Sequence, residues 1–286
     1  MALTPIFFAG LGKAAAPGGA LDLWLNGDQL PMTPVLAFDI ETVPDCAGIR
    51  QLYALPADLP DREVAEVAFQ KRRTQTGHDF LAPHLHRVVV ISCVLRTDDG
   101  IQVFSLGEPE REAIQRFHDG IEKYTPQLVS WNGGGFDLPV LNYRALAHGV
   151  TAAKFWDQGE EDRDFKWNNY VSRYHQRHID LMDLLALYQP RNFAPLDEVA
   201  QLAGLPGKIG MGGAAVWEAY QGGEQAKIRD YCEADCANTY LLWLRFQRLR
   251  GVLTEAQHRK ECALLREWMK QHPAPHWREF LGRWKD

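Results

Sequence analysis

The 286-residue sequence predicts an α/β fold in which a mixed sheet is flanked by helices. A strand-forming run at Val35–Val43 is apolar on both faces, as in a central strand that is covered on both sides. Two further runs, Arg87–Leu95 and Ile101–Leu106, are separated by a turn at 97–100 and predict an antiparallel hairpin. One more strand at Gln127–Trp131 stands between segments of helical periodicity, which completes the α/β pattern.

The first strand carries two carboxylates, Asp39 and Glu41, which are two positions apart and therefore point to the same face. Leu36, Phe38 and Ile40 occupy the opposite face. Two acids on a strand that is buried on both sides require a cation, so the pair predicts a metal site. Taken alone, the pair could also be one solvated charge and one turn residue at the end of the strand.

A long insertion follows the first strand, from Asp45 to about His86. Its predicted helix runs through Arg62–Gln70 and leads into a basic stretch at 71–73. This stretch is a candidate contact for phosphates, and a solvated helix end explains it equally well. The insertion separates the first strand from the hairpin.

The second acidic segment lies where the strand Gln127–Trp131 breaks at three glycines, 133–135. A helix near Glu110–Tyr124 is predicted before that strand. Glycines permit unusual backbone angles and the close approach of a ligand. Asp137 follows at the start of the next helix, where capping is the alternative to a role in a site. A P-loop is excluded because no Gly-Lys-Ser/Thr follows the glycines.

The third acidic segment opens a long helix that continues to about Arg250. Tyr231 and Asp235 are four residues apart and share a helix face with Ile228 and Leu242, which should be buried. A buried acid without a basic neighbour is costly unless a cation meets it. This helix is therefore a second candidate source of metal ligands.

The three acidic segments, in this order, resemble the motifs of the DEDD exonucleases, which have an RNase H-like fold. The tyrosine of the third segment resembles the DEDDy subtype, found in the proofreading domains of family-B DNA polymerases and in their stand-alone bacterial relatives. The sequences at 37–44 and 230–235 are most similar to the stand-alone group. The matching motifs are Phe38-Asp39-Ile-Glu41, Asn132-x-x-x-Phe136-Asp137 and Tyr231-x-x-x-Asp235.

The resemblance implies a metal-dependent 3'-5' exonuclease that acts on single-stranded DNA and releases nucleoside 5'-monophosphates. Asp39, Glu41, Asp137 and Asp235 would hold two Mg²⁺ or Mn²⁺ ions, which prefer oxygen ligands, and Tyr231 would orient the attacking water. Two alternatives stay open. One is an exoribonuclease or oligonucleotide nuclease with the same chemistry, and the other is a nucleic-acid-binding module without turnover.

Contacts to the substrate strand are predicted at Asn132 and Phe136 in the second motif, at Trp167 and at Lys208. Aromatic residues alternate with cations over 154–178, which is typical of sites for single-stranded nucleic acid, although such clusters are more often packing. Lys208 lies in a glycine-rich loop and could meet a phosphate. Plain flexibility of the loop would explain its glycines too.

Two more acids, Asp180 and Asp183, lie between the second and third motifs. They are three residues apart on a helical pattern and match none of the motifs. A capping or structural role is therefore predicted for them.

The composition limits the classes of protein to which the chain can belong. No apolar run approaches the roughly 20 residues that a membrane-spanning helix needs. The formal net charge of -6 argues against a protein that coats nucleic acid non-specifically. Five cysteines without paired spacing predict a reducing, cytoplasmic setting. Cys232 and Cys236 lack a second ligand pair and are predicted to be core residues rather than zinc ligands.

Three parts are expected along the chain. Residues 33–250 form the exonuclease domain, and residues 251–286 form a helical extension packed on it, whose helix begins at a capping Thr254. Residues 1–32 are expected to be a tail that is flexible or not native, with Met32 as the native start. A signal peptide is the alternative for this tail.

Overall fold

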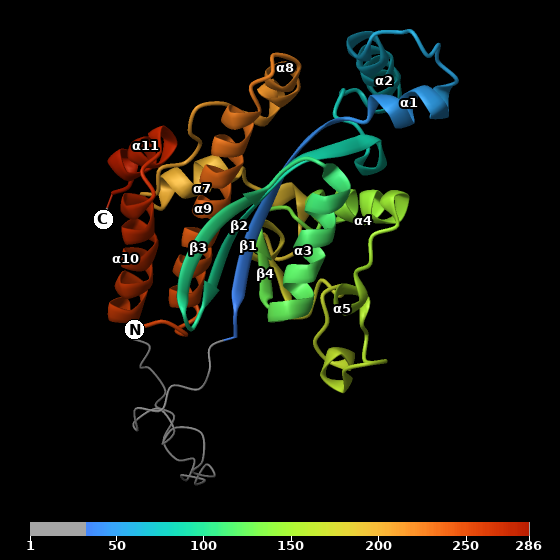
Figure 1. Cartoon of the computed structure of the whole chain (residues 1–286). Helices are drawn as coiled ribbons and strands as arrows, with labels where there is room; N and C mark the ends of the chain where they lie inside the picture. The colour runs from blue at the N-terminus through green and yellow to red at the C-terminus, as the bar shows by residue number, and fades with distance from the viewer. Residues whose placement is uncertain (1–32, 286) are drawn as a thin grey trace, which may run out of the picture. The chain divides into compact units, whose positions relative to one another are not determined.

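The computed structural model describes residues 33–285, so the predictions made for residues 1–32 lie outside the described residues. These described residues form one five-stranded sheet in the order β3-β2-β1-β4-β5 (Figure 1). β1 pairs antiparallel with β2 and parallel with β4, and β4 pairs parallel with β5. The strands are β1 (Val35–Pro44), β2 (His86–Thr97), β3 (Gly100–Leu106), β4 (Gln127–Ser130) and β5 (His178–Asp180).

Helices flank this sheet on both sides, which confirms the predicted α/β class with an RNase H-like mixed sheet, an insertion after the first strand and C-terminal helices. Among residues 33–285, no helix is both long and apolar enough to cross a membrane. The helices are α1 (Cys46–Tyr53), α2 (Asp61–Thr76), α3 (Glu110–Tyr124), α4 (Asp137–His148), α5 (Ala153–Trp156), α6 (Leu181–Leu185), α7 (Leu196–Leu202), α8 (Val216–Gln221), α9 (Gln225–Leu249), α10 (Glu255–Gln271) and α11 (Pro275–Arg283).

The central strand β1 is buried on both faces, as its sequence predicts. Val35 and Ala37 pack in one apolar cluster with residues of α9, whereas Leu36 and Phe38 pack in another with residues of α3 and α4. Figure 1 shows α9 on one side of the sheet and α3 and α4 on the other. Asp39 and Glu41 continue the face of Ala37, so they point to the side that α9 covers.

The pairing of β1 with β2 is irregular directly after the two acids. Glu41 lies opposite Val90, but Thr42 lies opposite Val88, so one residue of β2 is skipped. A bulge of this kind bends the pair and increases its twist. Asp39 and Glu41 precede the bulge and therefore keep the alternation that places both carboxylates on one face.

The insertion after β1 folds as two helices that pack on each other. The sequence predicts helix over Arg62–Gln70, whereas α2 runs from Asp61 to Thr76 and ends at Gly77, whose φ of 83° is favoured by glycine. α1 was not predicted. Arg73, in the basic stretch, pairs with Glu66 and Asp79. The apolar residues shared by the two helices and the following loop include Ile49, Val64, Ala65, Ala68 and Leu81.

The helical pattern predicted for Asp180 and Asp183 is wrong for Asp180, which ends strand β5 (His178–Asp180). Leu128 of β4 lies opposite His178, and Ser130 lies opposite Asp180. A three-residue strand is too short to show an alternating pattern. It forms because β4 offers an unpaired edge whose backbone groups need partners.

Two C-terminal helices pack on α9. α10 begins with the predicted cap: the Thr254 hydroxyl accepts from the Gln257 amide, and the Gln257 side chain accepts from the Thr254 amide. Leu265 on α10 and Phe280 on α11 are fully buried in the same cluster as the middle of α9. The C-terminal helices therefore extend the core on that side of the sheet.

His118 on α3 gives a testable pH dependence. Its side chain is buried, neither ring nitrogen has a partner among the described residues, and burial lowers its pKa from 6.5 to about 4. The unfolded chain therefore binds more protons below pH 6.5, and stability is lost as pH falls through that window. We expect His118→Leu to increase the free energy of unfolding by about 2 kcal/mol more at pH 5 than at pH 8. Urea denaturation at both pH values checks this, and an equal effect at both would contradict it.

Candidate active site

The predicted motif residues meet at the edge where β1 and β4 end. The two strands are parallel neighbours, so their carboxyl ends lie together, as in other open α/β sheets with a site at this edge. Asp39 and Glu41 come from the end of β1, and Asp137 begins α4 shortly after β4. α9 packs across the same side of the sheet and supplies Tyr231 and Asp235. Three segments distant in sequence thus contribute to one site.

The four carboxylates lie close enough to repel one another. Burial, followed by the charges of Asp137, Glu41 and Asp235, raises the pKa of Asp39 well above its usual value. Burial, followed by the charges of Asp235 and Asp137, does the same to the pKa of Glu41. Burial also raises the pKa of Asp137 to about 7 and that of Asp235 to about 6. Such a cluster of buried acids is unfavourable unless cations neutralise it.

Asp137 faces the site rather than capping its own helix. Its Oδ1 atom accepts a hydrogen bond of 3.1 Å from the backbone N–H of Ile40, between the two acids of β1. Phe136 is the N-cap residue of α4, and that N-terminus has no side-chain cap. The capping alternative for Asp137 is therefore wrong, because its carboxylate is held against β1.

Asp235 has a carboxylate oxygen that the described protein groups do not satisfy. Its Oδ1 atom is buried and has no hydrogen-bond partner within residues 33–285. A buried oxygen without a partner is costly, and a cation at this position would remove that cost. Neighbouring Tyr231 is 4% exposed, and burial, followed by the charges of Asp235 and Glu41, raises the pKa of its phenol. The phenol therefore stays protonated and can donate a hydrogen bond.

Cys232 also belongs to the site, which its sequence did not indicate beyond its position next to Tyr231. Its sulfur lies 3.4 Å from both the backbone oxygen and the Oδ2 atom of Asp39. Burial, followed by the charges of Asp39 and Glu41, raises the pKa of the thiol, so it donates rather than binding metal as a thiolate. Cys236 is fully buried and donates to the backbone oxygen of Ala37, as expected of a core residue.

The glycine turn after β4 is held in place by Asp180. Its two carboxylate oxygens accept from the backbone N–H groups of Asn132 and Gly134, each at 2.9 Å. Gly133 is required by close approach, since a Cβ atom there would lie 2.3 Å from the Ser130 hydroxyl oxygen. The structural role predicted for Asp180 is confirmed, because it fixes the turn that leads to Asp137 and also caps α6.

Of the residues predicted to contact substrate, Lys208 lies beside the acids. Its ammonium is 5.9 Å from the centre of the Tyr231 ring. Its charge opposes the rise in pKa that burial causes at Glu41 and Asp235. Asn132 starts the glycine turn with a φ of 66°, a left-handed conformation that asparagine tolerates.

The other two predicted contacts lie in different surroundings. Phe136 packs edge-on against His86, with ring centres 5.0 Å apart. Trp167 is 77% exposed and its described ring contact is with Lys166, so the structure does not bring it to the acids. From the same aromatic stretch, Phe165 and Tyr170 are core residues. For those two, the packing interpretation is correct.

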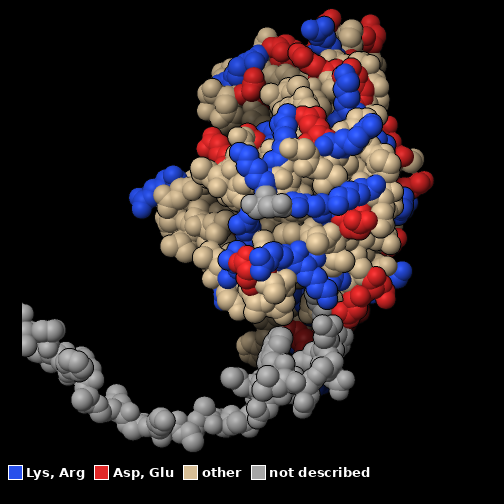
Figure 2. All heavy atoms as spheres, turned by 90° about the vertical axis from the view of Figure 1, so that its left-hand side faces the viewer, with Lys and Arg blue, Asp and Glu red and all other residues tan. Residues whose placement is uncertain are grey.

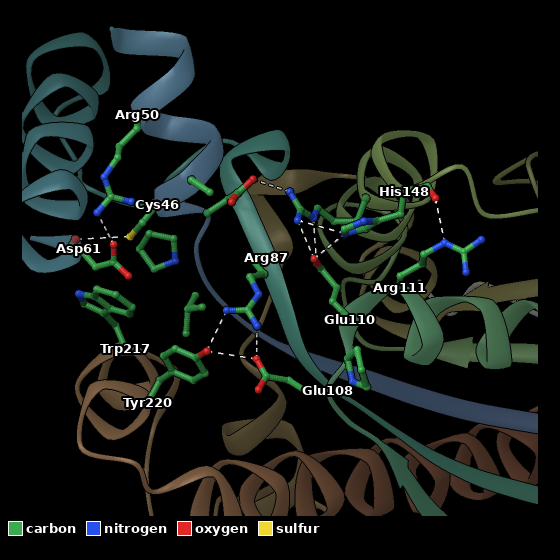
Figure 3. A pocket seen from close by; sticks show the side chains of 16 residues that line it. Cys46, Arg50, Asp61, Arg87, Glu108, Glu110, Arg111, His148, Trp217 and Tyr220 are labelled. Atoms are coloured by element: carbon green, nitrogen blue, oxygen red, sulfur yellow. Dashed lines mark hydrogen bonds and ion pairs between the residues drawn. The ribbon is translucent and has the colours of Figure 1, made fainter. Parts of the chain in front are cut away.

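A separate cavity of about 760 Å³ lies beyond the end of β1, between the insertion, α4 and α8 (Figure 3). None of the predicted site residues lines it. Its charged groups are paired with one another: Arg87 with Glu108, Arg50 with Asp61, and Arg144 with two acids. The pairing indicates a polar network that holds the insertion on the sheet.

The fold and the site together define an RNase H-like α/β protein with buried acids at the carboxyl ends of its strands. The chain belongs to a family described as "Predicted 3'-5' exonuclease related to the exonuclease domain of PolB", which matches residues 78–284. The matched region contains the second and third acidic motifs and begins after the first. The place of Asp39 and Glu41 in the site therefore rests on the geometry of β1.

The proteins similar to this chain include the following DNA polymerases. The DNA polymerase of Archaeoglobus fulgidus is 26% identical over 163 residues, which are 56% of this chain and 20% of that polymerase. The solved structure of the family B DNA polymerase from the hyperthermophilic archaeon Pyrobaculum calidifontis matches 73% of this chain and 24% of its own, at 21% identity and a TM-score of 0.44. The chain thus spans a small part of each polymerase.

Proposed function

We propose that this protein is a metal-dependent 3'-5' exonuclease of the DEDDy type that removes nucleoside 5'-monophosphates from single-stranded DNA. The observation that carries the proposal is the convergence of four carboxylates, two buried on Asp137 and Asp235 and two partly buried on Asp39 and Glu41, with a protonated tyrosine on one edge of the sheet. Membership of the exonuclease-like family supports the reaction and its direction. A stand-alone enzyme in the cytoplasm is part of the proposal, and the five cysteines, all unpaired and all within the described range, support a reducing setting.

The donor atoms of the site suit two Mg²⁺ or Mn²⁺ ions. Asp39, Glu41, Asp137 and Asp235 offer hard carboxylate oxygens, and the unsatisfied Oδ1 atom of Asp235 fits a metal ligand. When bound, such ions make a water nucleophilic near neutral pH and stabilise charge on the leaving oxygen. The fixed position of Asp137 against β1 keeps its carboxylate oriented toward the other acids.

The remaining residues of the site would position the reactants. The protonated phenol of Tyr231 would donate a hydrogen bond and orient the attacking water. Lys208, which is exposed beside this ring, would meet a phosphate of the strand. Asn132 and Phe136 would line the path to the site from the turn before α4, whereas Trp167 would contact the strand farther away.

Replacing Tyr231 with phenylalanine tests the proposed division of roles. We expect Tyr231→Phe to lower kcat by about 10- to 100-fold, because one hydrogen bond to the water is lost while the carboxylates remain. Single-turnover hydrolysis of labelled DNA measures this change, and the Asp137→Ala protein provides the comparison. If both variants lost activity to the same extent, Tyr231 would have to do more than position the water.

The proposed reaction is tested with 5'-labelled single-stranded DNA and RNA of one sequence, with Mg²⁺ or Mn²⁺, beside a strand blocked at its 3' end. The expected result is a descending ladder from DNA that requires metal and a free 3' end, and that is absent with Asp137→Ala. A ladder from RNA in preference to DNA would favour the exoribonuclease. Strands that are bound in a gel but intact under every condition would favour the binding module.

A further inference from the structure

A second cavity, of about 630 Å³, lies between α9, α10 and the C-terminal residues, outside the acidic site. The charged side chains that line it are mostly cations, although the whole chain has a net charge of -6. Such a local concentration of positive charge attracts polyanions. Among residues 33–285, the charged side chains that line the cavity are five cations and one acid: Arg245, Arg248, Arg259, Arg266, Lys285 and Glu255.

The cations of this basic cavity come from facing helices. Leu241, Arg245 and Arg248 recur at intervals of four and three residues, so they share one face of α9. Arg259 faces them from α10, and Leu205 closes the apolar part of the cavity. The helices are held by the buried cluster described above, so the guanidinium groups are presented on a rigid support.

Glu255, the one acid among the described residues that line the basic cavity, does not neutralise it. Glu255 is paired with Arg248 and lies 4.0 Å from Arg259, so one carboxylate is shared between two guanidinium groups. Arg245 donates to the backbone oxygen of Ala203 at 3.2 Å, and none of the carboxylates in residues 33–285 pairs with it. Positive charge therefore remains available for an anionic ligand.

The basic cavity is connected to the acidic site through the loop that carries Lys208. Arg283 donates to the backbone oxygen of Lys208 at 3.1 Å, and the backbone N–H of Lys285 donates to Gly204 at 3.1 Å. Figure 2 shows Lys and Arg side chains gathered across the face that includes α10 and α11. Lys208, Arg283 and Lys285 thus connect the Tyr231 ring to the cavity, although Arg283 is also paired with Glu279.

We propose that the basic cavity binds the phosphate backbone of the substrate strand at a distance from the 3' end that is cleaved. The proposal rests on the proposed function, because it names where the same strand is held. Contacts between arginine and phosphate do not depend on base sequence and would position the strand without selecting it. A strand fits these connected cations better than a mononucleotide, which could reach only some of them.

The test compares the wild type with the double variant Arg245→Ala, Arg259→Ala. Binding is measured by fluorescence anisotropy in EDTA, which prevents cleavage, with a long single-stranded DNA over a range of salt concentrations. We expect the affinity of the variant to fall about tenfold and its salt dependence to decrease by about 0.7 for each phosphate that the variant no longer neutralises. The matched control, Arg62→Ala with Lys123→Ala, removes the same charge from α2 and α3 and should bind as the wild type does.

Activity distinguishes this site from the acidic one. With metal, the double variant should show a raised KM for a long strand, an unchanged kcat, and unchanged hydrolysis of a dinucleotide. Since Arg259 has a side chain that is 72% exposed, Arg259→Glu provides a second variant whose folding is not at risk. Loss of DNA binding in both variants would support binding of the strand at the basic cavity, even if the wild type had no nuclease activity.

Two results would overturn the proposal. One is an affinity and salt dependence for the long strand that stay at the wild-type value in both variants. The other is displacement of the long strand from the wild type by thymidine 5'-monophosphate, when the mononucleotide is present at the same concentration as the nucleotides of the strand. That result would mean that the cavity binds a free nucleotide.

Discussion

Replacing Asp137 with alanine is expected to lower kcat/KM for single-stranded DNA by about 10³-fold or more, because the proposed metal ions would supply several kcal/mol of stabilisation to the reaction. Asp137 is held by the N–H of Ile40 between the two acids of β1, so its removal takes away a ligand that is already in position. The same change should also weaken metal binding. Thermal unfolding with and without Mn²⁺ would report this, since a ligand at 100 times its Kd adds about 2.7 kcal/mol to the wild type.

A control for this prediction is Asp119→Ala, which removes an exposed acid from α3 on the other face of the sheet. This variant should keep its activity and its response to Mn²⁺. Activity of Asp137→Ala within tenfold of the wild type, together with an undiminished response to Mn²⁺, would exclude Asp137 from the metal site.

The second large effect is expected at Arg144, in the polar network beyond β1. Its guanidinium lies 2.6 Å from Glu110 and 2.5 Å from Asp45, and these side chains are at most 14% exposed. His148 pairs with the same Glu110, and the backbone N–H of Val88 donates to it. Arg144→Met leaves two buried carboxylates without their main partner, which should cost about 3 to 5 kcal/mol in the free energy of unfolding.

Urea denaturation near pH 7 would measure the loss at Arg144. The matched control is Arg73→Ala, which breaks ion pairs with Glu66 and Asp79 in which each side chain is about half exposed. Such a pair contributes about 0 to 1 kcal/mol, so the control should be nearly neutral. Equal losses in the two variants would mean that burial of the Arg144 network adds nothing to stability.

Local patterns predict the strongest elements of this fold. β1 is recognisable because it is apolar on both faces, and α3 because its apolar residues recur with helical spacing. β5 is not recognisable, because its three residues form a strand only when the edge of β4 is present. α1 was missed for a similar reason, since its packing against α2 was not visible in a segment of eight residues.

The acids of the site were also predictable from their spacing, whereas their convergence was implied only by the resemblance to the DEDD exonucleases. Spacing places Asp39 and Glu41 on one face, and it places Tyr231 and Asp235 on another. The parallel pairing of β1 with β4 and the packing of α9 across β1 bring those faces together, and both are tertiary features. The thiol of Cys232 reaches Asp39 for the same reason.

The helix α9 carries Asp235 in the acidic site and Arg245 in the basic cavity, ten residues apart on one continuous helix. At 1.5 Å per residue the two lie about 15 Å apart along the axis, and a well-packed helix holds that separation constant. α9 would then set the shortest strand that can be bound at both sites. A strand trimmed below this length loses its contact with the basic cavity. Digestion should slow sharply at that length, so that short oligonucleotides of defined size accumulate before they are degraded further.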